Sequence, residues 1–98
     1  KELLMTNDEL LTMLKYNLNK TAAAQEPYLQ QLLEVAAHEI RREGIKTLSA
    51  DNLDDCNLIV MYAAYLFRKR AEDNPVMPRM LRYALNNRLF AEKLGGTT

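Results

Sequence analysis

The stretch LIVMYAAYLFRKR, residues 58–70, decides how this chain folds. Ten residues without a charge, 58–67, run directly into Arg68, Lys69 and Arg70. Such a stretch is compatible with a membrane anchor, a DNA-reading helix or the buried central helix of a small domain whose charged ends meet partners. A helix that crosses a bilayer needs about 20 apolar residues, and this run has about half that number. Its side chains are apolar on nearly every helical face, which indicates a helix packed against several neighbours.

The composition fits one small globular domain. The chain has 98 residues, of which 48% are hydrophobic and 27% are charged, and this balance is typical of a folded domain with one core. We expect a single helical domain over residues 1–98, with residues 1–6 and 95–98 frayed. The sequence does not open with a positively charged segment followed by an apolar one, so we expect no signal peptide and a soluble protein.

Apolar residues recur at helical spacing, and the sequence has no alternating run long enough for a strand. This pattern predicts an all-α fold, a small four-helix domain with a long central apolar helix. The first predicted helix starts after Thr6, which forms a capping box with Glu9. The second has Pro27 in its first turn and Gly44 as a left-handed C-cap.

The third and fourth helices are bounded by polar residues, prolines and glycines. We expect the third helix to run from about residue 50 to residue 72, with Ser49 or Asp51 as its N-cap. The fourth is expected to begin near Pro78 and to stop at Gly95 and Gly96. We expect the inward-facing side chains of the other three helices, and of the turn after Gly44, to complete the core around the apolar helix. These are Leu10, Leu11, Leu14, Leu18, Leu29, Leu32, Leu33, Ala36, Ile40, Ile45, Leu48, Met77, Met80, Leu81, Ala84 and Leu85.

The sequence offers no constellation for catalysis. The single histidine, His38, has Glu34 and Arg42 one helical turn away, which is a surface pairing pattern, and no nucleophile or orienting group is indicated for it. Cys56 follows two aspartates, whose carboxylates raise the pKa of a thiol rather than activate it. We therefore expect Cys56 in or near the core, and a protein that is not an enzyme and holds no cofactor.

Three aspartates are the candidates for a metal site. Asp51, Asp54 and Asp55 lie at the start of the third predicted helix, where the helix dipole favours carboxylates without any metal. Their spacing lacks the central glycine and the closing glutamate of a calcium loop. We expect no metal site.

The stretch EIRREGIKTLSADNLDDCN, residues 39–57, resembles a helix-turn-helix. A recognition helix presents basic and polar side chains near its N-terminus to DNA, whereas this helix begins with aspartates that phosphates repel. The rest of the helix is apolar. A sequence-specific DNA-binding regulator is therefore the alternative hypothesis rather than the leading one.

Three stretches carry a resemblance to a known family. They are EPYLQQLLEVAAHEIRREG, LIVMYAAYLFRKRAED and PVMPRMLRYALN, at residues 26–44, 58–73 and 75–86. The first is a predicted helix with a leucine pair followed by alanines and a final glycine. The second is an apolar helix that ends in basic residues. The third is a segment that begins with a proline. In this pattern and order the chain resembles the small head-to-tail connector (head-completion, or adaptor) proteins of long-tailed double-stranded DNA phages and prophages.

The resemblance implies a structural protein without enzymatic activity. Such proteins assemble as a ring beneath the portal at one capsid vertex, extend the DNA tunnel and offer a docking surface to the next protein. The implied partners are other copies of the chain in a ring of about twelve, the portal protein, a downstream head-completion or tail protein, and genomic DNA that passes without sequence-specific contacts. No membrane is implied. The implied location is the head–tail junction of the virion, after synthesis in the cytoplasm of the bacterial host.

Charge is distributed unevenly along the chain. Residues 1–67 carry 6 basic and 10 acidic side chains, and residues 68–98 carry 7 basic and 3 acidic ones. An acidic surface on one copy can therefore meet a basic surface on the next in a head-to-tail ring; alternatively, the charges mix within each folded chain. The candidate inter-subunit or portal contacts are Arg68, Lys69, Arg70, Arg79, Arg82, Arg88, Asp51, Asp54 and Asp55.

Overall fold

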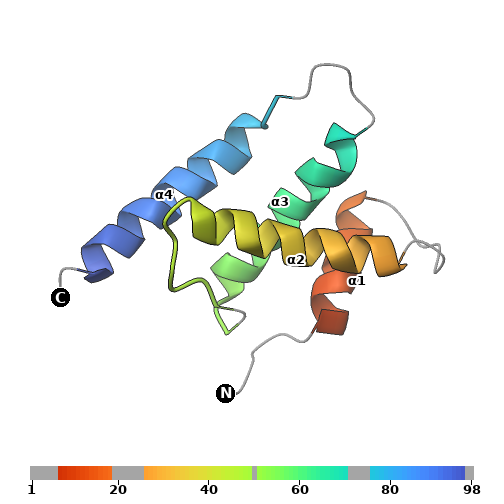
Figure 1. Ribbon diagram of the computed structural model, residues 1–98, viewed down its shortest axis with the longest axis horizontal. Coiled ribbons are helices and arrows are strands. Elements are labelled where there is room, and N and C mark those ends of the chain that lie inside the picture. Colours follow the sequence, from red (N-terminus) through yellow and green to blue (C-terminus); the bar gives the residue numbers. More distant parts are fainter. Residues whose placement is uncertain (1–6, 19–25, 50, 71–75, 97–98) are drawn as a thin grey trace.

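The third helix of the chain packs against each of the other three. The computed structural model describes residues 7–18, 26–49, 51–70 and 76–96, which contain α1 (Asn7–Leu18), α2 (Glu26–Arg42), α3 (Leu53–Lys69) and α4 (Arg79–Gly96). α3 contacts each of the other helices; α2 crosses it, and α1 and α4 lie on opposite sides of it (Figure 1). These described segments contain no strand, so the predicted all-α fold of four helices is confirmed. The result is a thin plate of 45 × 36 × 17 Å.

α2 begins and ends as its sequence predicts. Pro27 lies in the first turn, where its missing N–H is not needed by the helix. After the last turn, Gly44 adopts a positive φ of 116°, a conformation that residues with a side chain rarely adopt. A Cβ atom at this position would also lie 3.1 Å from Cδ1 of Leu89 on α4. Glycine at this turn therefore permits both the change in chain direction and the close approach of α4.

The N-cap of α3 is Asn52, so the prediction of Ser49 or Asp51 is wrong. The Asn52 side-chain oxygen accepts hydrogen bonds from the N–H groups of Asp54 at 2.8 Å and Asp55 at 3.2 Å. The Ser49 hydroxyl instead accepts a hydrogen bond from the Asp51 N–H at 3.0 Å and shapes the preceding turn. The predicted start at residue 50 is corrected accordingly.

α3 is central but not long. It has 17 residues, as α2 does, and α4 has 18. Its last helical residue is Lys69 and its C-cap is Arg70, so the predicted end at about residue 72 is wrong. None of the helices in the described segments combines the length and the apolar character that a membrane crossing requires.

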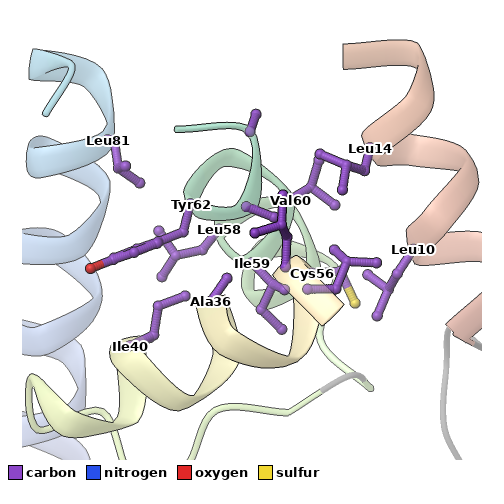
Figure 2. Packing of buried hydrophobic residues seen from close by; sticks show 14 of the residues in the cluster. Leu10, Leu14, Ala36, Ile40, Cys56, Leu58, Ile59, Val60, Tyr62 and Leu81 are labelled. Carbon is purple, nitrogen blue, oxygen red and sulfur yellow. The ribbon is translucent and has the colours of Figure 1, made fainter. Parts of the chain in front are cut away.

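The core forms around α3 as expected. Figure 2 shows Leu14 of α1 beside Val60, the Tyr62 ring directed towards α4, and Ala36 and Ile40 of α2 packed below. The buried residues of α3 are Cys56, Leu58, Ile59, Val60, Tyr62, Ala63 and Ala64, together with the charged Asp55. All the core residues predicted on α1, on α2 and in the turn that follows Gly44 are buried.

α4 departs from its predicted pattern. Leu81 and Leu85 are buried, but Met80, which was also assigned to the inner stripe, is 72% exposed. Met77 and Ala84 are only partly buried. The helix includes the glycines at positions 95 and 96 rather than stopping before them. Residues 95 and 96 are therefore not frayed as expected. Residues 1–6 and 97–98, which are also expected to be frayed, lie outside the described residues. So does Thr6, the predicted partner of Glu9 in a capping box.

We predict that Leu14→Ala lowers the free energy of unfolding by about 2–5 kcal/mol, because Leu14 is fully buried and its loss leaves a cavity. The same change at Leu53, which is 54% exposed at the start of α3, should alter it by less than about 0.5 kcal/mol. Urea denaturation followed by circular dichroism measures both. Equal effects of the two substitutions would contradict the packing of α1 on α3.

Candidate functional site

An apolar stripe on α4 faces away from the rest of the subunit. Met80, Tyr83, Phe90 and Leu94 are 72%, 59%, 64% and 54% exposed. Their successive spacings of three, seven and four residues place them on one side of the helix, away from the buried Leu81. A stripe of large exposed apolar side chains is typical of an interaction surface. We call these four residues the α4 face.

A second apolar surface lies across α3, on the side where α1 packs. Tyr16 is 80% exposed, and with Met13 it borders a shallow groove between α1 and α3. Asn57 and Met61 of α3 line this groove and also line a second groove, between α3 and α4. We call Met13, Tyr16, Asn57 and Met61 the α1 face. Met13 and Tyr16 of this face belong to α1, whereas Asn57 and Met61 belong to the central helix α3. The α4 face belongs to the helix on the other side of α3 (Figure 1).

The residues of these two faces were not among the candidates named from the sequence, which were all charged. The signal for the α4 face is a second apolar stripe, running through Tyr83, Phe90 and Leu94, beside the stripe that contains Leu81 and Leu85. No comparable signal marks Tyr16, a single aromatic residue on α1.

One predicted contact, Asp55, is not at the surface. Its side chain is 2% exposed, and its carboxylate pairs with Arg88 through Nε–Oδ1 and Nη2–Oδ2 contacts of 2.6 and 3.3 Å. The Ser49 N–H donates to the same carboxylate at 3.0 Å. The hydrogen bond to Asp55 raises the pKa of Arg88, although partial burial opposes this. Asp55 and Arg88 therefore join α3, the preceding turn and α4 within one subunit, which corrects the expectation that Asp55 meets another molecule.

The same arginine extends the polar contacts along α4. Arg88 Nη1 lies 3.3 Å from Glu92 Oε1, and Arg88 Nη2 donates to the Thr47 hydroxyl at 3.0 Å. The Thr47 hydroxyl and N–H both donate to Glu92. The hydrogen bond from the Thr47 hydroxyl is the main reason why the pKa of Glu92 is lowered. These contacts fix the turn after α2 to the C-terminal half of α4.

Other candidate cations also have contacts within the subunit. Arg82 pairs with Glu43 through two contacts of 3.2 and 3.4 Å. Arg68 donates to the backbone carbonyl of Asn17 at 3.1 Å and to its side-chain oxygen at 3.2 Å. Arg82 and Arg88 thus pair with acidic residues of the first two thirds of the chain, so the charges of the two regions partly mix on folding.

The remaining candidates lie at or near the surface. Lys69 is 5.8 Å from the centre of the Tyr65 ring, and Arg70 is 4.8 Å from that of Tyr28, as in cation–π contacts. The other three are Arg79 and Asp54, which are exposed, and Asp51, which is partly buried. The structure does not gather all these candidates into one patch. The end of α3 lies near the start of α4, where Arg79 is, because Arg68, Lys69 and Pro78 line one pocket. Asp51 and Asp54 are at the other end of α3.

The residues considered for catalysis are separated. His38 is exposed on α2, and Cys56 is fully buried beside Leu10 (Figure 2). Burial, and then the charges of Asp55, Asp51 and Glu9, raise the pKa of the Cys56 thiol, in the direction expected from the sequence. Within the four described segments, no group of three or more His, Cys, Asp or Glu residues is arranged to hold a metal ion.

Comparison with models of protein families, with curated proteins and with solved structures finds no match to this chain.

We predict that Arg88→Met destabilises the protein by about 3–5 kcal/mol, because it leaves the Asp55 carboxylate buried without its cation. The double variant Asp55→Asn with Arg88→Met should be less destabilised, since the amide carries no charge and still accepts from Ser49. Arg82→Met is the control and should have an effect below about 1 kcal/mol, because its pair with Glu43 is more exposed. Unfolding free energies in urea measure all three. A double variant no more stable than Arg88→Met would contradict this account.

We also predict that Glu92 contributes to acid unfolding. A lowered pKa means that the folded protein binds this proton less tightly than the unfolded chain does. Its stabilising contribution is therefore complete above the ordinary pKa of 4.5 and is lost as the pH falls through the lower pKa of the folded state. Glu92→Gln should make the free energy of unfolding fall less steeply below this pH, as measured by urea titrations at a series of pH values. An unchanged pH profile would show that Glu92 makes no such contribution.

Proposed function

We propose that this chain is a structural assembly subunit: a head-to-tail connector that forms a ring under the portal of a long-tailed phage, extends the DNA tunnel and offers the attachment surface for the tail or the next adaptor. The supporting observation is the α4 face, with two aromatic and two aliphatic side chains exposed along one edge. Such a stripe leaves much apolar surface in water, and association with another protein removes it.

The arrangement of contacts favours assembly over catalysis as the proposed role. The strongest polar cluster, around Asp55 and Arg88, is used to attach α4 to α3. The α4 face lies outside this cluster. The α1 face borders it, because Asn57 and Met61 share a groove with Asp55 and Arg88. The three stretches that resemble connector proteins correspond to α2, to the body of α3 with the connection after it, and to the first half of α4 with the residues before it. The α4 face begins in the last of these and continues beyond it.

The alternative of a helix-turn-helix regulator receives less support. α3 occupies the position of the recognition helix, but α1, α2 and α4 all contact it. Its exposed N-terminal turn carries Asp54, which DNA phosphates repel. With three helices packed against it, only one side of this helix is left to enter a major groove.

We predict that deleting this coding sequence from the parent phage or prophage genome gives DNA-filled heads that fail to join tails, because the attachment surface is missing. Electron microscopy of the lysate measures the fraction of tailed particles. Supplying the wild-type protein should restore joining, and so should Val35→Glu, a control on the exposed side of α2. Tyr83→Glu on the α4 face should restore it poorly.

Normally tailed particles after the deletion would refute the connector role. Purified protein that binds duplex DNA tightly, with an affinity that falls steeply as salt increases, would favour the regulator instead. Circular dichroism of each variant establishes that the substitutions leave the helical fold intact.

A further inference from the structure

The α4 face is a stripe on the outer side of one helix, and the α1 face is a shallow groove between α1 and α3. We infer that they bind each other between copies: the α4 face of one copy docks against the α1 face of the next, in a head-to-tail contact. This inference rests on the proposed function, because it names the surfaces by which the connector subunits associate. Contacts between two different patches extend from copy to copy and close into a ring when the rotation between copies permits.

The shapes of the two faces are complementary. The α4 face presents a ridge of large side chains, including Tyr83 and Phe90, along the outer side of a helix. The α1 face presents a groove, with Met13 and Tyr16 on one wall and Met61 on α3. A helix laid along a groove between two other helices buries apolar side chains at helical spacing. Aromatic residues and methionine, which dominate both faces, are enriched in the cores of protein interfaces.

The charges at the two faces are also complementary. α4 carries four basic residues and one acidic residue; Arg82 and Arg88 pair within the subunit, while Arg79 is exposed at the N-terminal end of the α4 face. The first turn of α1 carries Asp8 and Glu9. Docking that places the start of α4 near these carboxylates brings Arg79 and the positive end of the α4 dipole towards negative charge.

Symmetric pairing of two α4 faces is less favourable. In an antiparallel arrangement, Arg79 of each copy lies beside Lys93 of the other. In a parallel arrangement, each of these cations meets its own equivalent. Both arrangements bring like charges together, and like-charge contacts oppose association. The head-to-tail contact instead places Arg79 beside Asp8 and Glu9, an attraction that neither two-fold arrangement offers.

A mixing experiment with two blocked variants tests the inference. Tyr83→Glu with Phe90→Glu blocks the α4 face, and Tyr16→Lys blocks the α1 face; all three residues are mostly exposed, so the subunit fold is retained. Analytical ultracentrifugation should show that each variant alone associates about tenfold or more weakly than the wild type. An equal mixture of the two should associate again, because each supplies the face that the other lacks. Val35→Lys on α2 is the matched control and should behave as the wild type.

Each other outcome overturns the inference. If only the α4 variant loses association, the contact is a symmetric pair of α4 faces. If neither variant loses it, a different surface is used. If the blocked mixture stays dissociated, or if the wild type remains monomeric at millimolar concentration, the two faces do not bind each other. Circular dichroism melting of every variant separates loss of contact from loss of fold.

The phage experiment distinguishes this inference from the proposed function. A wild-type protein that stays monomeric but restores tail joining leaves the connector role standing and removes the head-to-tail contact. A protein that associates as inferred but is dispensable for tail joining leaves the contact standing and removes the connector role.

Discussion

A helix that is apolar on nearly every side must be covered, and this constraint organises the molecule. α2 crosses α3, and α1 and α4 cover its two sides. The buried alanines Ala36, Ala63 and Ala64 leave room for the helices to approach closely. Because one helix serves as the common support, α1 and α4 are kept apart on opposite edges of a plate only 17 Å thick. The outward sides of these two helices are therefore available to other molecules.

α4 depends on polar contacts more than the other helices do. Leu81 and Leu85 bury its inner side, and the Asp55–Arg88 pair and the Arg82 contact with Glu43 attach it at further points. A buried ion pair adds little net stability compared with apolar packing, but an arrangement that separates its partners leaves a buried charge without compensation. The position of α4 is thus specified by directional contacts, and its outer side can remain apolar without redirecting the fold.

Much of the fold is predictable from local spacing, whereas the candidate site is not. The stripe through Leu10, Leu14 and Leu18 identifies the inner side of α1, because its other faces are more polar. On α4 the same reasoning fails for Met80: this helix has two apolar stripes, and spacing alone does not say which one faces inward. The prediction that Asp55 contacts another molecule fails for a different reason. Its cation, Arg88, lies 33 residues further along the chain, and no local pattern connects them.

Gly44 links the backbone of one turn to the placement of a distant helix. Its positive φ directs the chain out of α2, and the space where a side chain would stand is bordered by Leu89 of α4. A side chain at this position would require Cδ1 of Leu89 to move by a few tenths of an ångström, in addition to the strain of the positive φ. The packing of α4 against the turn after α2 is consequently sensitive to a residue that belongs to neither α3 nor α4.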